Sequence, residues 1–127
     1  MTPKQLLSLY KNFAVIGVTN DTTKFGYKIY KRLKEKGFNT FGISPKYNEI
    51  DGDTIYDNLD VVPAPIDVAV FVINPKFAKE YIGQMRTIGI GYAWMQPGTY
   101  NDEILDLMKS HGITPIIDCI LVQTEDL

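Results

Sequence analysis

The sequence predicts one α/β domain built on a doubly wound, five-stranded parallel sheet. Three observations support this fold class: short apolar segments alternate with helical patterns, the connections between them are short, and the alternation continues to the end of the chain. The length of 127 residues suits a single domain, which we assign to residues 1–127. Because parallel strands are joined by right-handed crossovers, we expect the strand order 3-2-1-4-5, with an extra N-terminal helix.

The chain begins with the signal for a helix. Thr2, Pro3 and Gln5 match a capping box with proline at the first helical position. We interpret residues 3–11 as this helix and residues 1–12 as an N-terminal helical extension of the domain. The helix is expected to pack on the core or on a partner subunit.

A strand, a helix and a second strand follow. Residues 13–18 (FAVIGV) form a short β-branched run. Residues 25–36 place apolar side chains at helical spacing, and Gly37 stands where glycine usually follows a helix. Residues 39–43 (NTFGI) predict the second strand. The side chains expected to share one face of this helix are Phe25, Ile29 and Leu33.

The middle of the chain, residues 46–66, carries the weakest pattern. Asp51 and Gly52 mark a turn. We expect one short helix over residues 56–62, before two prolines interrupt the chain.

Three further strands alternate with helices in the second half. Asn74 and Pro75 are typical of a helix start, with asparagine as the cap and proline in the first helical position. Asn101 opens another helix in the same way. Pro115 favours an edge position for the last strand, because proline has no N–H to donate to a neighbour. These strands are expected at residues 67–73, 91–95 and 113–117.

Composition and charge exclude several classes of protein. Hydrophobic residues make up 45% and charged residues 22% of the chain, which excludes intrinsic disorder and coiled coil. No apolar run approaches about 18 residues and the N-terminus lacks the pattern of a signal peptide, so we expect no membrane association. The formal net charge of −2 argues against nucleic-acid binding. The single cysteine cannot form an internal disulfide and fits a reducing cytoplasm, which is the expected location.

The sequence shows no catalytic or metal-binding arrangement. His111 is the only histidine, and it stands in the last turn of a predicted helix, where an imidazolium complements the helix dipole. Without a second histidine or clustered cysteines, we expect no zinc site. No Ser–His–Asp or paired-carboxylate arrangement can be argued from the spacing, so we assign no catalytic residue.

The candidate site lies where the strands end. In folds of this class, ligands bind beyond the carboxyl ends of the strands, beside the point where the strand order reverses. With the expected order, this point lies between the first and fourth strands. The residues that follow each strand are therefore the candidates.

The loop after the first strand suits a phosphate group. Gly17 lets the backbone approach a ligand closely, and Lys24 adds a cation at the mouth of the loop. Hydroxyl donors could come from Thr19, Thr22 and Thr23. The loop ends at a helix start, whose unpaired N–H groups and partial positive charge favour anions. It matches neither the GxGxxG nor the Walker A pattern, so it carries no specific dinucleotide or triphosphate signature. The alternative is a strand-to-helix turn without a ligand.

The loop after the second strand is Ser44-Pro45-Lys46. Enzymes that bind NAD usually carry an acidic residue near this point for the ribose 2′-hydroxyl. A lysine here prefers a phosphorylated ribose, which favours NADP or coenzyme A over NAD. The alternative for Lys46 is a solvated lysine in a turn.

The remaining strand ends offer three candidates. Residues 73–75 cap a helix, and their apolar side chain and rigid proline could also border an adenine. Residues 96–98 form a stiff turn with one amide side chain at the predicted switch point. Cys119 is either a small core residue or a thiol that faces the cleft, where it could form a mixed disulfide with a thiol-bearing ligand.

The ordered set of segments resembles a known family. From about residue 12 to residue 122, the chain is similar to the small stand-alone CoA-binding proteins, relatives of the CoA-binding domain in the succinyl-CoA ligase α subunit and in ADP-forming acyl-CoA synthetases. The segments that carry the resemblance are VIGVTND…KFGYKIYKRLKEKGFNTFGISPK, PIDVAVFVINP, AWMQPGTYNDE and GITPIIDC. The resemblance implies a Rossmann-like domain that binds coenzyme A or an acyl-CoA across the strand ends.

The resemblance also implies contacts at particular positions. These are nucleotide contacts at Gly17, Val18 and Thr19; closure around phosphate by Lys24, Phe25 and Gly26; a phosphate contact by the Ser44, Pro45 and Lys46 segment; a border for the adenine at Ile73, Asn74 and Pro75; and a lining toward the pantetheine arm at Gln96, Pro97 and Gly98. Cys119 matches a cysteine common in these proteins. The chain departs from the family at Ser44, where asparagine is usual, and at residues 120–123, where the family is often more polar.

These observations favour a CoA-binding module without a reaction of its own, acting as a carrier, a sensor or a protector of the thiol. Two alternatives stay open: an NADP-binding reductase or fragment of one, and a regulatory or interaction subunit that has lost ligand binding. A homodimer is compatible with the apolar edges that a small open sheet leaves exposed.

Overall fold

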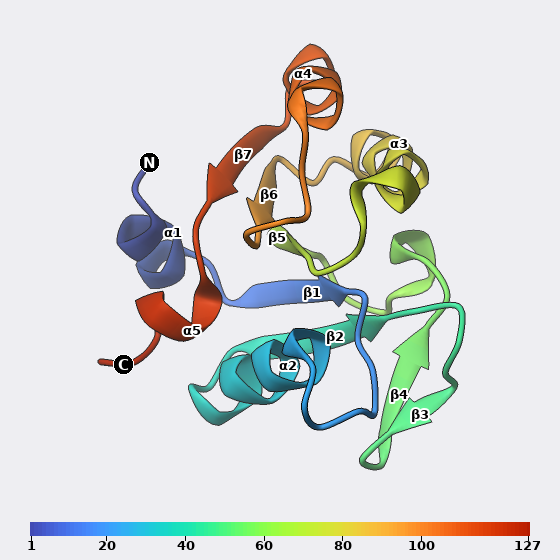
Figure 1. The fold of residues 1–127 in the computed structure, drawn as a ribbon, viewed down its shortest axis with the longest axis vertical. Helices are drawn as coiled ribbons and strands as arrows, with labels where there is room; N and C mark the ends of the chain where they lie inside the picture. Colours follow the sequence, from blue (N-terminus) through green and yellow to red (C-terminus); the bar gives the residue numbers. More distant parts are fainter.

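A mostly parallel sheet with helices on both faces forms the structure, a computed structural model that describes residues 1–127 (Figure 1). The sheet has seven strands in the order β3-β4-β2-β1-β5-β6-β7, and only β3 runs antiparallel to its neighbour. The strands are β1 (Asn12–Ile16), β2 (Asn39–Ile43), β3 (Glu49–Ile50), β4 (Asp53–Tyr56), β5 (Val68–Phe71), β6 (Tyr92–Met95) and β7 (Thr114–Ile117). The helices are α1 (Pro3–Leu9), α2 (Phe25–Glu35), α3 (Ala78–Ile88), α4 (Asp102–Ser110) and α5 (Ile120–Gln123), with short 3-10 helices at Leu59–Val61 and Pro75–Phe77.

The predicted fold class is confirmed, but the expected strand count and order need correction. Residues 53–56 form a parallel strand, β4, that the sequence reading did not include. This strand takes the third position, beyond β2, so the expected third strand (β5) lies beside β1 instead. The strand order reverses between β1 and β5, and not between the first and fourth predicted strands.

The missed strand had a weak sequence signal for a physical reason. β4 has four residues and only Ile55 is buried, so it shows no apolar run. A two-residue antiparallel partner, β3, precedes it. The predicted turn at Asp51 and Gly52 joins β3 to β4, and both residues have positive φ angles, of 51° and 85°, as tight hairpin turns require. The helix expected over residues 56–62 is only the 3-10 helix Leu59–Val61.

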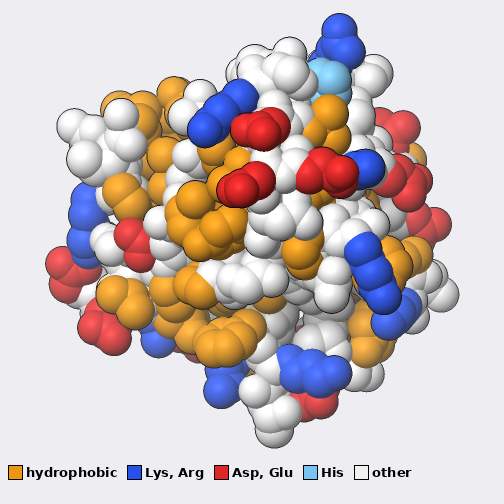
Figure 2. Space-filling model, turned by 45° about the horizontal axis from the view of Figure 1, so that its top comes forward, with side chains coloured by type: hydrophobic (Ala, Val, Ile, Leu, Met, Phe, Trp, Pro, Cys, Tyr) orange, Lys and Arg blue, Asp and Glu red, His pale blue; other side chains and the backbone are white.

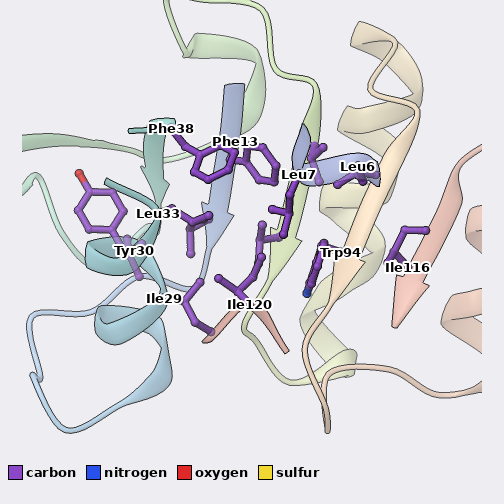
Figure 3. Packing of buried hydrophobic residues seen from close by; sticks show 14 of the residues in the cluster. Leu6, Leu7, Phe13, Ile29, Tyr30, Leu33, Phe38, Trp94, Ile116 and Ile120 are labelled. Atoms are coloured by element: carbon purple, nitrogen blue, oxygen red, sulfur yellow. The ribbon is translucent and has the colours of Figure 1, made fainter. Parts of the chain in front are cut away.

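One core lies on each face of the sheet. The first contains side chains from α1, α2 and α5, which cover the same face (Figure 3). The second contains side chains from α3 and α4 on the opposite face. Trp94 of β6 is fully buried in the first core.

The N-terminal helix belongs to the first core. Both hydrogen bonds of the predicted capping box are present, and Leu6 and Leu7 are buried against the sheet (Figure 3). The helix ends at Leu9, two residues before the predicted end. It also lies beside the C-terminal segment, because Lys4 Nζ donates a hydrogen bond to the carbonyl of Gln123 at 2.7 Å. Of the two packing partners expected for this helix, the structure shows the core.

The inward face of α2 is smaller than expected. Ile29 and Leu33 are fully buried, but Phe25 is 58% exposed. Phe25 is the first residue of the helix, so its ring lies at the end of the helix instead of over the sheet. Of the three side chains expected on one face of the helix, only Ile29 and Leu33 belong to the core.

Other large hydrophobic side chains also remain at the surface. Figure 2 shows hydrophobic side chains gathered on one face, with charged side chains around them. The most exposed of the large hydrophobic residues are Met1, Leu9, Phe25, Val61, Phe77, Ile88, Ile117, Val122 and Leu127. Across the chain, every helix is too short or too polar to cross a membrane.

Candidate functional site

A cleft of about 1190 Å³ opens at the carboxyl ends of the strands. It is formed by the loops after β1, β2, β5 and β6, together with the start of α2, the start of α3 and Cys119. From β1 the chain crosses to the face covered by α2, and from β5 it crosses to the face covered by α3. The cleft therefore lies at the topological switch point of the sheet, where doubly wound folds bind their ligands. Its volume exceeds the upper end of ordinary small-molecule pockets, about 1,000 Å³.

Nearly all of the predicted site residues line this cleft. They are Gly17, Val18, Thr19, Lys24, Phe25, Gly26, Ser44, Pro45, Lys46, Ile73, Asn74, Gln96, Pro97, Gly98 and Cys119. Pro75, the first residue of the 3-10 helix after β5, does not line it. That these side chains contact a ligand stays a prediction.

The cleft also has a second wall that the sequence reading missed. Thr23, whose hydroxyl was predicted for the loop after β1, also lines the cleft. The unpredicted lining residues are Ile43, Tyr47, Val72, Lys76, Phe77, Lys79, Glu80, Tyr81 and Thr99. Five of these nine come from the 3-10 helix after β5 and the first turn of α3. Their sequence signal was that of an ordinary helix start, so only the corrected position of β5 beside β1 could have revealed them.

Two glycines let the loop after β1 pack tightly. Gly17 has a φ of +100°, and a Cβ there would lie 2.5 Å from the carbonyl oxygen of Val72. A Cβ on Gly26 would lie 2.3 Å from the carbonyl oxygen of Gly17. The loop is thus held between the end of β5 and the start of α2 with no room for a side chain at either position. This geometry explains why the sequence needs glycine at both places.

Hydrogen bonds within the loop order its polar residues. Asp21 accepts hydrogen bonds from the N–H of Thr23 at 3.0 Å and from its hydroxyl at 2.6 Å. The N–H of Asp21 donates to Thr19 Oγ1 at 3.2 Å, and the N–H of Lys24 donates to the Asp21 carbonyl at 3.1 Å. The Thr23 hydroxyl, the Thr23 N–H and the nearby Lys24 charge lower the pKa of the Asp21 carboxyl.

The start of α2 is open toward the cleft. Lys24 is the N-cap residue, and no side chain accepts a hydrogen bond from the first turn. The N–H groups of Phe25, Gly26 and Tyr27 have no hydrogen-bond partner. Lys24, Phe25 and Gly26 all line the cleft, so this helix presents free donors and a partial positive charge at its wall.

Three lysines of the cleft have no acidic partner. The ion pairs of the molecule involve other lysines, at positions 4, 31, 34 and 79, so Lys24, Lys46 and Lys76 are unpaired. The N–H of Lys46 donates to Ser44 Oγ at 3.1 Å, which fixes the turn after β2. All three lysines lie in the lining of the same cleft, as a shared anionic ligand would require.

The loop after β5 follows the predicted cap. Asn74 accepts a hydrogen bond from the N–H of Lys76 at 3.0 Å, and Pro75 takes the first position of the 3-10 helix. The methyl group Cγ2 of Ile73 lies close to the backbone of Gly17. Ile73 and Asn74 therefore stand next to the loop after β1 in the cleft wall.

The side-chain amide of Gln96 forms its hydrogen bonds within the protein. Its Oε1 accepts hydrogen bonds from Trp94 Nε1 at 3.2 Å and from the N–H of Ile120 at 2.7 Å. Its Nε2 donates to Cys119 Sγ at 3.5 Å, and the residue is only 4% exposed. Gln96 thus ties the end of β6 to the start of α5, which the sequence did not indicate because α5 was not predicted.

Cys119 is a free, half-buried cysteine in the cleft lining. It precedes α5 as the N-cap residue. Of the two interpretations left open by the sequence, its position in the lining agrees with a thiol that faces the cleft. No group of three or more His, Cys, Asp or Glu side chains lies in an arrangement that could hold a metal ion.

The fold and the position of the cleft define a Rossmann-like α/β domain. Its family follows from the sequence model described as "CoA binding domain", which matches residues 11–125, so the chain belongs to this family. The resemblance stated from the sequence is confirmed at this level.

Known relatives agree with this assignment. Over 115 residues the chain is 39% identical to an ADP-forming acetate–CoA ligase of Methanocaldococcus jannaschii, covering 84% of this chain and 16% of the ligase. It is 27% identical over 124 residues to the uncharacterized protein YneT of Bacillus subtilis, covering 94% of this chain and 89% of that protein. A solved structure of a conserved hypothetical protein from Pyrococcus furiosus has a TM-score of 0.85 and 31% identity, covering 91% of this chain and 100% of that one.

The chain spans only a small part of the ligases it matches, 16% of the one above and 18% of an ADP-forming ligase subunit from Pyrococcus furiosus. It spans most of YneT. The similarity therefore covers the CoA-binding domain and leaves out most of each ligase.

Proposed function

We propose that the chain binds coenzyme A or an acyl-CoA in the cleft, as a module without a reaction of its own. The observation that carries this proposal is the combination of an uncapped α2 start with unpaired lysines, Lys24 and Lys46 among them, in one cleft. CoA carries a pyrophosphate and a ribose 3′-phosphate, so it needs donors and cations at separate points. Membership of the CoA-binding domain family supports the same ligand.

The phosphates are assigned to two loops. The pyrophosphate lies against the loop after β1, where the free N–H groups of α2 and the Lys24 ammonium group face the cleft. The 3′-phosphate lies at Lys46, which follows β2. These contacts are charge-assisted hydrogen bonds, which contribute about 1.5–3 kcal/mol each.

The rest of the ligand follows the cleft. Ile73 and Asn74 border the adenine, and Gln96, Pro97 and Gly98 lie along the pantetheine arm. Because the Gln96 side chain is held by Trp94 and Ile120, its part is to shape the wall and not to reach out to the ligand.

The wider role is that of a carrier, sensor or protector of the CoA thiol. The ligases in the comparison are named for a reaction with acetate and CoA, and this chain corresponds to a small part of them. We assign it the recognition of CoA and not the ligase reaction. The single cysteine fits a reducing cytoplasm, and the net charge of −2 does not suit nucleic acid. A homodimer is compatible with this role.

The experiment is a titration of the protein with CoA and with NADPH, by calorimetry and by thermal unfolding. We expect CoA to bind and to raise the melting temperature more than NADPH. Lys24→Ala and Lys46→Ala should each weaken CoA binding roughly tenfold to a hundredfold. Lys109→Ala, at the end of α4 outside the cleft, is the matched control and should change nothing.

Each alternative gives a different result in the same titration. A larger shift with NADPH would favour a reductase or a fragment of one. No effect of either ligand at millimolar concentration would contradict the proposal and point to an interaction subunit.

Cys119 gives the proposal a chemical test. Its thiolate attacks one sulfur of CoA disulfide, a protein–CoA disulfide forms, and one CoA leaves as a thiolate. Wild-type protein treated with CoA disulfide should gain a CoA adduct that dithiothreitol removes. Cys119→Ser should gain none, and an adduct that persists in this variant would rule out the assignment.

A further inference from the structure

Tyr47 connects the two loops that the proposed function assigns to phosphate. Its hydroxyl lies 3.1 Å from Thr19 Oγ1 in a half-buried hydrogen bond, in which either hydroxyl can donate. Thr19 belongs to the loop after β1, and Tyr47 directly follows Lys46 in the loop after β2. Both side chains line the cleft. This is the hydrogen bond that joins side chains of these two loops.

The bond is anchored at both ends. On one side, the Tyr47 ring packs against the core on the α2 face of the sheet. On the other side, Thr19 Oγ1 also accepts the N–H of Asp21, which in turn orders Thr23 and Lys24. A continuous set of hydrogen bonds therefore runs from the core-packed Tyr47 to the backbone of Lys24.

We propose that Tyr47 is a positioning residue that makes the two phosphate-binding loops act as one rigid unit. The identity of the ligand in this inference rests on the proposed function. The bridge itself, the hydrogen bond between Tyr47 and Thr19, does not depend on it. With the bridge in place, the loops are ordered before the ligand arrives, so binding does not bear the cost of arranging them. The bridge increases the affinity of a ligand that contacts both loops, whereas it only slightly changes the affinity of a ligand that contacts one loop.

The experiment compares Tyr47→Phe, Thr19→Val and the double variant. Tyr27→Phe is the matched control, because it also loses a hydroxyl hydrogen bond, to Asp51, but lies outside the cleft lining. Each single variant should weaken CoA binding about twofold to tenfold, and the double variant no more than either one. Dephospho-CoA lacks the 3′-phosphate and engages one loop, so its affinity should fall by a smaller factor. The control should leave both affinities unchanged.

Several outcomes would overturn the inference. Additive losses in the double variant would mean that the two hydroxyls act independently. An equal loss for CoA and dephospho-CoA would mean that the variants only disturb the fold. A loss with Tyr47→Phe that Thr19→Val does not reproduce would mean that the Tyr47 hydroxyl contacts the ligand directly.

A second measurement needs no ligand. In the free protein, amide hydrogen exchange at Asp21 and Thr23 should be faster in Tyr47→Phe than in wild type or Tyr27→Phe. Unchanged exchange rates in Tyr47→Phe would contradict the proposed role of the bridge, even if CoA binds. If wild-type protein does not bind CoA, the proposed function fails, and the exchange rates alone decide whether the bridge exists.

Discussion

The loops after β1 and β6 occupy equivalent places in the fold but use their polar groups differently. Each follows a buried parallel strand, lines the cleft and leads into a helix. Before α4, Asn101 accepts a hydrogen bond from the N–H of Ile104 at 2.9 Å and caps the helix. Before α2, Lys24 caps nothing, and the first N–H groups of the helix have no partner.

The two loops therefore differ in role: the polar groups of the loop after β6 stabilise the fold, and those of the loop after β1 stay free to bind a ligand. In the loop after β6, Gln96 and Asn101 give their hydrogen bonds to the protein itself. In the loop after β1, the internal bonds of Asp21 order the loop but leave the helix start and the Lys24 ammonium free. An uncapped helix start costs stability, which a bound anion would restore. We therefore assign the ligand pyrophosphate to the loop after β1.

The largest effect should come from Gly26→Ala. The new Cβ would lie 2.3 Å from the Gly17 carbonyl oxygen, so the loop after β1 must move away from α2. We expect the free energy of unfolding to fall by about 1–3 kcal/mol, as for other overpacked sites. CoA binding should weaken by about a hundredfold, because more than one phosphate contact is lost. Chemical denaturation and calorimetry measure the two effects.

Gly83→Ala is the control for this change. Gly83 lies within α3, and a Cβ there would meet nothing within 4 Å. This variant should be more stable by about 1 kcal/mol, as alanine is the better helix former, with unchanged CoA affinity. If Gly26→Ala binds CoA with the affinity of the wild type, the loop after β1 does not belong to the CoA site.

An intermediate effect is expected from Lys24→Ser, which gives α2 the cap that α4 already has. The free protein should gain about 1 kcal/mol of stability, because serine accepts a hydrogen bond from the first turn. CoA binding should weaken more than about tenfold, because the cation is lost and a free donor is occupied. Thermal unfolding with and without CoA shows both changes.

The opposite substitution completes the comparison. Asn101→Ala removes the cap of α4 and should lower stability by about 1 kcal/mol without altering CoA affinity. If Lys24→Ser destabilises the protein, or if Asn101→Ala weakens CoA binding as strongly, the two helix starts do not differ as described.

The smallest effect concerns the pKa of Asp21. In the folded protein the Thr23 hydroxyl and N–H hold this pKa below its ordinary value. The carboxylate therefore stabilises the loop at pH values above about 4, and this contribution is lost as the pH falls through the lowered pKa. Thr23→Val removes the hydroxyl donor and should raise the Asp21 pKa toward its ordinary value. NMR titration of the carboxyl carbon measures the pKa, and an unchanged value would show that the hydroxyl does not order the loop.

The elements with strong local patterns could be predicted from the sequence. The buried strands β1 and β5 are continuous apolar runs, and the caps at Thr2, Asn74 and Asn101 are local signals that the structure reproduces. The strands β3 and β4 could not be predicted in this way. Their pairing depends on contacts across the sheet and on the α2 side chains that hold the hairpin, such as Tyr30, whose hydroxyl donates to Asp53 at 2.9 Å.

The same distinction applies to the site. Residues of the loops that follow strands, such as Lys24 and Lys46, could be placed at the cleft because parallel strands end at one edge of the sheet. Lys76 and Phe77 were missed because β5 was placed on the wrong side of β2, away from the switch point. The bond between Thr19 and Tyr47 joins residues 28 positions apart, and no local pattern reports such a contact.

The most direct test of the account is a two-dimensional ¹H–¹⁵N NMR titration of the wild-type protein with CoA. If the pyrophosphate lies at the open start of α2 and the 3′-phosphate at Lys46, the amide signals of Gly17, Lys24, Gly26 and Lys46 should shift with saturation, while those of α4 beyond Asn101 stay in place. No shifts at millimolar CoA, or shifts confined to α4, would contradict it.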